Sequence, residues 1–201
     1  VEAFKYLLAT VETATVTMDS FVLHLDMLYL ASTNEKYLDA FKEHHDFPSF
    51  KGRIELVKVP YLRRYSNECD IYRPLINERT VGRHVAPHAI EIAALWGILT
   101  RMRRNDPKQY SKDIAEVIEE LSPMDKLALY DRGEVPEHLS ARLAKELVHV
   151  IPELYEETIG YPNYEGRFGA SAREIRTAML NAAHHDEYEC LSHFAVLEEI
   201  E

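Results

Sequence analysis

Residues 14–31 read ATVTMDSFVLHLDMLYLA, and this stretch holds the clearest strand pattern in the chain. From Ala14 to Met18, apolar side chains alternate with threonines, which predicts a strand that is buried on one face. The turn residues Asp19 and Ser20 follow, and the apolar run from Val22 to Ala31 predicts a second, more fully buried strand. The beginning of the chain is therefore expected to form part of a β-sheet.

Strand patterns end within the first third of the chain. The polar segment Ser32-Thr33-Asn34-Glu35 ends the second strand, and a short helix is predicted from Glu35 to about His44. A third strand is predicted from Ile54 to Val59. Pro60 closes it, because proline cannot donate a hydrogen bond to a sheet.

The remainder of the chain is predicted to be helical. Ser66 is a suitable N-cap for a helix that runs to Ile76, and Pro87 suits the first turn of a helix that reaches Met102. Apolar side chains recur at helical spacing in three further segments, 114–121, 139–150 and 171–182. Four prolines are expected to separate the helices: Pro123, Pro136, Pro152 and Pro162. The predicted fold class is mainly α with a small β portion, and the amphipathic helices are expected to pack as a bundle.

Composition limits the classes of function. The 201 residues carry a formal net charge of −11 and a pI near 5.4, which argues against a nucleic-acid partner. The longest apolar run, Phe21 to Ala31, is too short to span a bilayer and contains His24 and Asp26, so no membrane partner is expected and the protein should be soluble. Cys69 and Cys190 are not spaced as a metal site, which favours a reducing, cytoplasmic location.

The chain lacks the common catalytic motifs. It contains no Gly-x-x-x-x-Gly-Lys-Ser/Thr phosphate loop, no Gly-x-Ser-x-Gly elbow, no His-Glu-x-x-His helix and no Cys-x-x-Cys pair. It starts without a methionine and ends inside the helical pattern from Phe194 to Glu201, so we expect a fragment of a longer protein.

Three polar residues at the ends of predicted elements are candidates for function. Asn34 follows a buried strand, where open α/β sheets place ligand-binding groups, although it also suits the N-cap of the next helix. Arg53 precedes the third predicted strand, and its simpler interpretation is a solvated surface arginine. Arg173 falls in the first turn of a helix that starts with the capping box Ser171 to Glu174, where the helix dipole disfavours a cation unless an anion compensates.

The motif His-His-Asp occurs twice, at His44-His45-Asp46 and at His184-His185-Asp186. A shared metal ion would require the two motifs to meet in space, because adjacent histidines point in different directions. We expect no metal site.

Four segments, taken in order, resemble the PrkA-type serine protein kinases, whose N-terminal half is an AAA+ ATPase module. These segments are Ser32-Thr33-Asn34-Glu35, Gly52 to Tyr61 (GRIELVKVPY), Ala86-Pro87-His88 and Gly169 to Ile175 (GASAREI). The combination of Arg before Val-Pro-Tyr with Gly-Ala-Ser-x-Arg-Glu is the most specific part.

The resemblance implies a role for each candidate residue. Asn34 is similar to sensor 1, which orients the attacking water, and Arg53 is similar to the arginine finger that reaches the nucleotide of a neighbouring subunit. Arg173 is similar to sensor 2 on the lid helix. By resemblance, the intact parent would bind ATP and Mg²⁺ and form a homo-oligomer, whereas no cofactor is expected for the isolated chain.

The resemblance also implies a domain organisation. Residues 1–62 would be the C-terminal part of the AAA+ core, and residues 63–201 a helical lid that continues past the chain end. The phosphate loop would lie in a missing N-terminal ATPase core and a kinase-like region would lie downstream, so the isolated chain is expected to be inactive. Two alternatives stay open: a non-enzymatic helical docking or regulatory module, and part of an AAA+ motor for protein remodelling or proteolysis.

Overall fold

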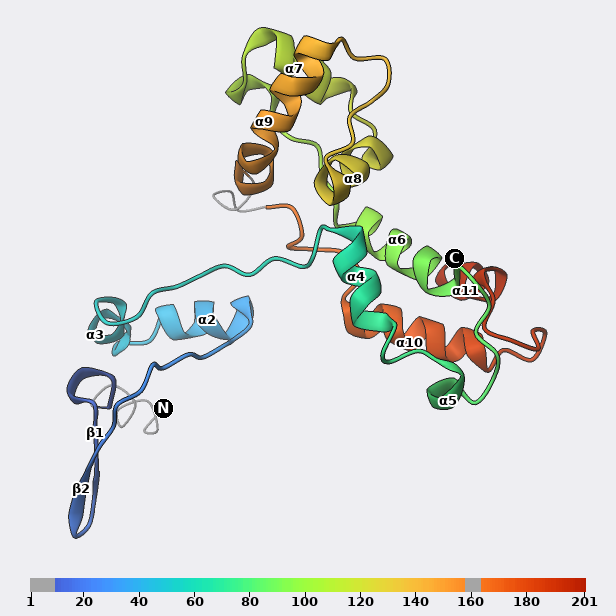
Figure 1. Cartoon of the computed structure of the whole chain (residues 1–201). Helices are drawn as coiled ribbons and strands as arrows, with labels where there is room; N and C mark the ends of the chain where they lie inside the picture. The colour runs from blue at the N-terminus through green and yellow to red at the C-terminus, as the bar shows by residue number, and fades with distance from the viewer. Residues whose placement is uncertain (1–9, 158–163) are drawn as a thin grey trace. The chain divides into compact units, whose positions relative to one another are not determined.

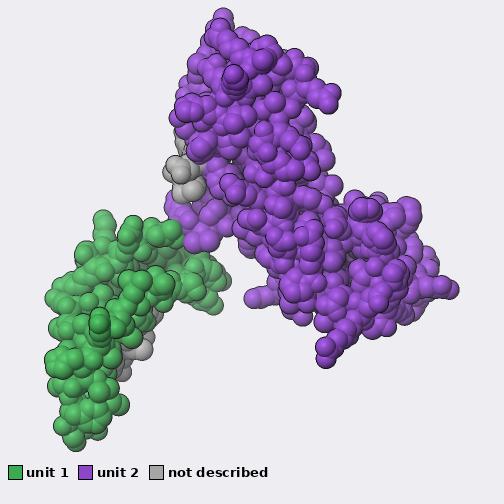
Figure 2. All heavy atoms as spheres, in the orientation of Figure 1, with its two compact units in different colours: residues 1–57 green, residues 58–201 purple. Residues whose placement is uncertain are grey.

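A computed structural model describes residues 10–157 and 164–201 (Figure 1). The chain divides into two compact units, Val1–Val57 and Lys58–Glu201, which Figure 2 shows in different colours. Each unit is described by itself.

The described part of the first unit contains helical residues 10–13, a hairpin and two further short helices. Strand β1 (Thr15–Met18) pairs antiparallel with β2 (Phe21–His24), with Val16 opposite Leu23, and helices α2 (Glu35–Lys42) and α3 (Phe47–Lys51) follow. A strand at the first predicted position and the helix at 35–44 are confirmed, but the burial of β1 does not alternate along the strand. The second strand was predicted too long and too buried, because β2 ends at His24, all four of its residues are exposed, and no regular element follows before α2.

The strand predicted from Ile54 to Val59 is wrong for this structure, which has no regular element there. A strand needs a neighbour to accept its backbone hydrogen bonds. Within the described part of the first unit, the sheet consists of β1 and β2 alone. The strand-type sequence is therefore present without a sheet to join.

The second unit is helical. Among residues 58–157 and 164–201, its elements are α4 (Tyr65–Tyr72), α5 (Glu78–Val81), α6 (Ala89–Arg101), the short 3₁₀ helix η1 (Pro107–Gln109), α7 (Lys112–Glu120), α8 (Pro123–Arg132), α9 (Ala141–Glu157), α10 (Ala172–Ala183) and α11 (His193–Ile200).

Two hydrophobic cores hold the second unit together. The first is formed by α4, α6, α10 and α11, with Tyr72, Ala94, Met179 and Val196 fully buried. The second is formed by α7, α8 and α9, around residues such as Ile114, Leu129 and Leu147. The apolar stripes of the amphipathic helices thus face each other, as the sequence predicted.

Local signals at the helix ends were only partly interpreted correctly. Ser171 caps α10 in the predicted capping box with Glu174. Ser66 is not an N-cap, because α4 starts one residue earlier and Ser66 instead donates its N–H and hydroxyl to Asp131. Pro87 precedes α6 rather than occupying its first turn, with His88 as the N-cap.

Pro152 corrects another expectation, because it lies inside α9 rather than between helices. Proline removes one helical hydrogen bond, which usually ends or kinks a helix. Here Leu147 and Leu154 on either side are 0% and 1% exposed, so packing against the second core holds the helix together.

The fold class is confirmed as mainly α with a small β portion near the N-terminus. None of the helices in the described ranges combines the length and the apolar character that a bilayer span requires.

Candidate functional site

Asn34 is the N-cap of α2. Its side-chain oxygen accepts the backbone N–H of Tyr37 at 3.2 Å, and its own backbone is extended. The capping interpretation of this residue is therefore correct. Its side-chain amide nitrogen makes no hydrogen bond with any residue that the structure describes, so two donor hydrogens are available for a ligand.

Arg53 lies just after α3 at the surface of the first unit. Its guanidinium donates to the Ser49 carbonyl at 2.5 Å and to Glu12 Oε1 at 2.9 Å, and its side chain is 36% exposed. An ion pair of this exposure contributes little to stability, about 0–1 kcal/mol. The pair with Glu12 can therefore be exchanged for another anion at small cost.

Arg173 is the second residue of α10 and is exposed. Its side chain makes no hydrogen bond or ion pair with the described residues. The backbone N–H groups of a helix start carry partial positive charge, so an unpaired arginine there adds to a local site for an anion. Asn34 and Arg53 belong to the first unit and Arg173 to the second.

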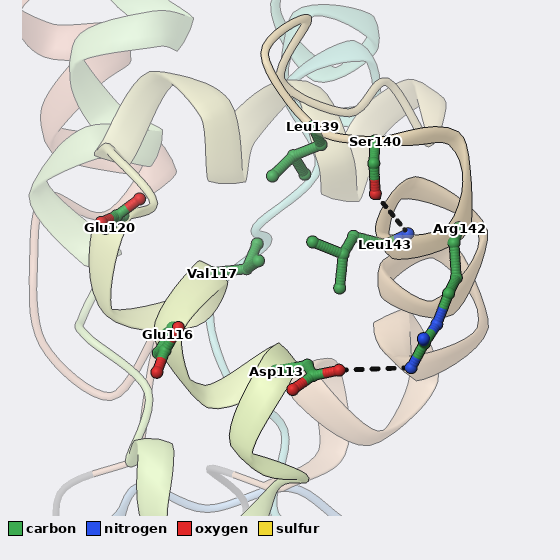
Figure 3. Close-up of a pocket in the computed structure, with 8 residues that line it drawn as sticks. All are labelled: Asp113, Glu116, Val117, Glu120, Leu139, Ser140, Arg142 and Leu143. Carbon is green, nitrogen blue, oxygen red and sulfur yellow. Dashed lines mark hydrogen bonds and ion pairs between the residues drawn. The ribbon is translucent and has the colours of Figure 1, made fainter.

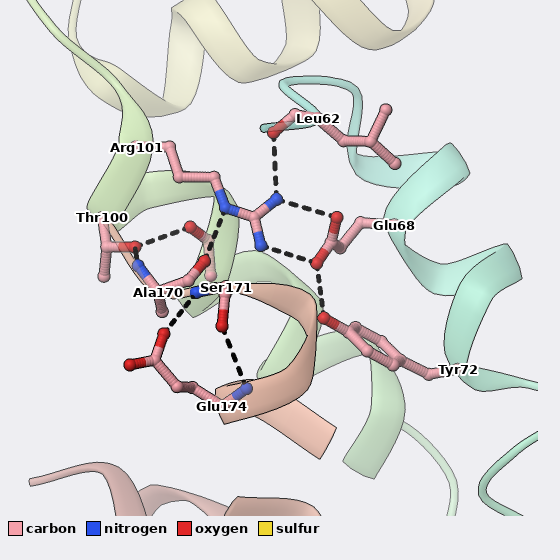
Figure 4. Close-up of polar contacts among 9 residues, drawn as sticks. Leu62, Glu68, Tyr72, Thr100, Arg101, Ala170, Ser171 and Glu174 are labelled. Carbon is pink, nitrogen blue, oxygen red and sulfur yellow. Dashed lines mark hydrogen bonds and ion pairs between the residues drawn. The ribbon is translucent and has the colours of Figure 1, made fainter. Parts of the chain in front are cut away.

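A buried polar network in the second unit was not predicted from the sequence (Figure 4). Arg101, in the last turn of α6, pairs with Glu68 of α4 through two hydrogen bonds of 2.8 Å, and both side chains are only 1% exposed. Arg101 also donates to the Leu62 carbonyl at 3.0 Å, and Tyr72 donates its hydroxyl to Glu68. The signal that was available is the position of Arg101 on the apolar stripe of Ala94 and Ile98, where a charged side chain requires a buried partner.

The same network holds the segment that leads into α10. The Ala170 N–H donates to Thr100 Oγ1 at 2.9 Å, and Arg101 Nε donates to the Ala170 carbonyl at 2.8 Å. The Gly166 N–H donates to the Arg101 carbonyl at 3.1 Å. The end of α6 is thereby attached to the start of the helix that carries Arg173.

A second buried carboxylate, Glu165, belongs to the segment that precedes α10. It accepts the Arg103 N–H at 2.7 Å and Lys126 Nζ at 2.6 Å, and Arg63 Nη1 lies 3.7 Å away. Glu165 is 0% exposed, and these cations satisfy the requirement that a buried charge be paired. This network fixes the connection between α6, α8 and the segment that precedes α10.

Burial and the two carboxylates perturb nearby tyrosines. Burial, followed by the hydrogen bond to Glu68, raises the pKa of Tyr72 well above its usual range, and burial and Glu165 do the same to the pKa of Tyr130. Burial raises the pKa of Tyr65 to about 12. These tyrosines are neutral structural groups at physiological pH, not acids poised for catalysis.

His44, His45 and Asp46 form a group whose ligand atoms lie within 4.8 Å of one another. His45 Nε2 lies 3.1 Å from the Asp46 carboxylate, and His44 Nδ1 accepts the Asp46 N–H at 3.3 Å. The second motif makes other contacts, because His184 Nδ1 lies 2.8 Å from the Leu180 carbonyl and His185 lies 3.8 Å from Glu198. The two motifs thus make separate local contacts, the first in the first unit and the second in the second unit.

A pocket of about 450 Å³ lies between α7 and the start of α9 (Figure 3). Val117, Leu139 and Leu143 form its apolar lining, and the exposed carboxylates of Asp113, Glu116 and Glu120 lie around it. Its one cation, Arg142, pairs with Asp113 at 3.2 Å. An acidic surface of this kind repels phosphate groups, so the pocket is not suited to a nucleotide. None of the three candidate residues lines it.

Comparison with known proteins identifies two matching families. The PrkA AAA domain family matches residues 3–109, and the PrkA serine protein kinase C-terminal domain family matches residues 124–201. No solved structure gives a significant match.

Two curated relatives match over part of their length. A Bacillus subtilis (strain 168) protein named ATP-dependent protease PrkA is 32% identical over 115 residues, which cover 57% of this chain and 16% of that protein. An Escherichia coli (strain K12) protein named serine/threonine kinase YeaG is 32% identical over 87 residues, 42% of this chain and 14% of that protein. The chain thus spans about a sixth or less of the length of these relatives. Because the AAA-domain match alone covers more than half of its residues, the chain belongs to the PrkA family.

Proposed function

We propose that this chain is the C-terminal part of an AAA+ core together with its helical lid, from a longer PrkA-type serine protein kinase. Residues 1–62 belong to the core, and residues 63–201 form a lid that continues past Glu201. The chain contributes Asn34, Arg53 and Arg173 to a site for ATP and Mg²⁺ whose phosphate loop is in a preceding segment. The intact protein works as a cytoplasmic homo-oligomer, and the isolated chain is inactive.

The exposed strand-type sequence of residues 25–31 and 54–59 carries this proposal. Leu28 and Leu30 are 85% and 84% exposed, and Val57 and Val59 are 73% and 83% exposed. Large apolar side chains clustered in extended segments are normally covered by other strands or helices. Further strands of a core sheet, supplied by a preceding segment, would cover them and give residues 54–59 the neighbour that a strand needs.

The hydrogen bonds and ion pairs of the three candidate residues support their proposed roles at the nucleotide. Asn34 uses only its oxygen for capping, so its amide nitrogen can donate to the γ-phosphate or the attacking water. Arg53 is held by a weak surface ion pair, which a departing phosphate of a neighbouring subunit would outcompete. Arg173 has no partner among the described residues and lies at a helix start, where a phosphate would offset its unfavourable position.

The experiment is ATP hydrolysis by the full-length protein with Arg173→Gln, compared with Arg176→Gln as the matched control. Arg176 is an exposed arginine three residues further along the same helix. We expect Arg173→Gln to lower kcat/KM for ATP by about tenfold or more, as loss of a charged phosphate contact would. The control should resemble the wild type. Equal activity of both variants would refute the sensor 2 assignment.

The arginine finger is tested by mixing subunits. Arg53→Gln should abolish turnover when all subunits of the oligomer carry it, yet an Arg53→Gln subunit mixed with a phosphate-loop variant should recover part of the activity, because each supplies what its neighbour lacks. Full activity of the pure Arg53→Gln oligomer would rule out the finger.

A second candidate function is an AAA+ motor that serves proteolysis, and the name of the Bacillus subtilis relative favours it. Labelled ATP with candidate protein substrates separates the two. Transfer of label to serine supports the kinase, whereas ATP-dependent release of peptides without labelled protein supports the motor.

A further inference from the structure

We propose that Thr100 and Arg101 are positioning residues that fix the start of α10, and through it Arg173, relative to α6. The inference rests on the proposed role of Arg173. It adds two residues that do not contact the nucleotide but determine where a nucleotide-binding side chain is held.

The contacts converge on a single residue. Ala170, directly before the N-cap Ser171, has both backbone groups engaged: its N–H by Thr100 Oγ1 at 2.9 Å and its carbonyl by Arg101 Nε at 2.8 Å (Figure 4). A backbone unit held at both its donor and its acceptor cannot rotate without breaking one bond. The position at which α10 starts is therefore fixed.

Arg101 is itself immobilised. Its two terminal nitrogens bind Glu68 at 2.8 Å each, and it is 2% exposed. A bidentate arginine–carboxylate pair fixes orientation as well as distance. The position of Ala170 is thus set by α4 as well as by α6.

Steric fit adds to the polar contacts. Gly169 has a φ of +116°, and a Cβ there would lie 2.7 Å from the Thr100 carbonyl oxygen and 2.8 Å from Arg101 Cγ. Gly97 faces α10 in the same way, because a Cβ there would lie 2.1 Å from Ile175 Cδ1. The two helices approach so closely that the start of α10 cannot shift toward α6.

Arg173 follows Ala170 by three residues, across the N-cap Ser171 and the first residue of α10, so a displacement of Ala170 is expected to move the Cα of Arg173. Displacements of about 1 Å in a reacting group can lower rates by about a hundredfold. A fixed helix start is therefore what a long side chain such as arginine needs in order to reach a phosphate reproducibly.

The test is Thr100→Val in the full-length protein, alone and combined with Arg173→Gln. Valine keeps the shape of threonine but removes the oxygen that accepts the Ala170 N–H. We expect KM for ATP to rise about two- to tenfold, the factor that one hydrogen bond of 0.5–1.5 kcal/mol represents, with no further rise in the double variant. Hydrogen exchange of the Ala170 amide should accelerate by a similar factor.

Thr80→Val is the matched control. It removes a threonine hydroxyl that bonds the Leu75 carbonyl and caps α5, so it lowers stability without touching the start of α10. The control should lower Tm and leave KM unchanged. An effect of Thr100→Val on KM no larger than that of the control, or one that adds fully to Arg173→Gln, overturns the positioning role. If Arg173→Gln alone leaves turnover unchanged, that result refutes the proposed role of Arg173 in binding the nucleotide. The positioning role depends on that proposal and is refuted by the same result.

Discussion

Replacing Glu68 by glutamine is expected to destabilise the helical unit more than any surface substitution. The change keeps the shape of the side chain and removes its charge. Arg101 would then be a buried cation without a counter-charge, since its acceptors would be the neutral glutamine amide oxygen and the carbonyls of Leu62 and Ala170. Tyr72 would also lose an ionised acceptor.

The magnitude follows from burial. Both side chains of the pair are 1% exposed, so solvent cannot replace the lost interaction. Breaking one side of such a buried pair costs about 3–5 kcal/mol. Domains of this size are stable by about 5–15 kcal/mol, so the variant would lose a large share of its stability. With a urea m-value of about 2 kcal/mol/M, the midpoint should fall by about 1.5–2.5 M.

The assay uses the one tryptophan of the chain. Trp96 lies in α6 and packs against the first core, so its fluorescence during a urea titration of the whole chain reports on the unit that contains the pair. The matched control is Asp113→Asn, which breaks the pair of Asp113 with Arg142, whose side chains are 57% and 79% exposed. That control should change stability by less than about 1 kcal/mol.

Two outcomes would refute this reasoning. The first is a midpoint for Glu68→Gln within the range of the control. The second comes from the double variant Glu68→Leu with Arg101→Met, which removes both charges. It should cost less than the sum of the two single substitutions, because neither charge is then left unpaired. Additive costs would show that the two side chains do not act as a pair.

Two further predictions concern packing and pH. Gly97→Ala should lower the free energy of unfolding of the second unit by about 1–3 kcal/mol through overpacking against Ile175, measured by the same titration. Raising the pH above about 10 should destabilise the second unit, because folding raises the pKa values of Tyr65, Tyr72 and Tyr130 and so favours their neutral forms. The stability that these tyrosines contribute is fully present below the pKa of an unfolded tyrosine. It is lost as the pH rises toward their pKa values in the folded protein. The tyrosinate absorbance of the buried tyrosines should then rise together with loss of helical circular dichroism, and a rise that is complete before unfolding would contradict the prediction.

The helices could be predicted because their signals are local. The capping box at Ser171 and the apolar stripe of α6 lie within a few residues of the elements they define. The local pattern from Ile54 to Val59 could not decide whether these residues form a strand, because a strand depends on a neighbouring strand that can come from anywhere in a protein. Pro152 was misinterpreted for a related reason, because packing of Leu147 and Leu154 against another core outweighs the local preference.

The candidate residues could be selected from the sequence, whereas the buried polar pair could not. Asn34, Arg53 and Arg173 were selected by family resemblance, and their nucleotide roles stay predictions. The pair of Glu68 and Arg101 was not predicted, because 33 residues separate its members and Arg101 belongs in the sequence to a basic group from Arg101 to Arg104. An arginine in register with an apolar stripe is the general sign of such a buried pair.

The exposed apolar side chains of the first unit also have a consequence for colloidal behaviour. From Phe21 to Ala31 the only carboxylate is Asp26, and no lysine, arginine or proline interrupts the segment. Such a segment, extended and without a covering layer, is a template for edge-to-edge association between copies. The net charge of −11 opposes that association at low ionic strength, and salt weakens this protection. Lysine at positions 28 and 30 would place charges in this segment and so reduce association between copies.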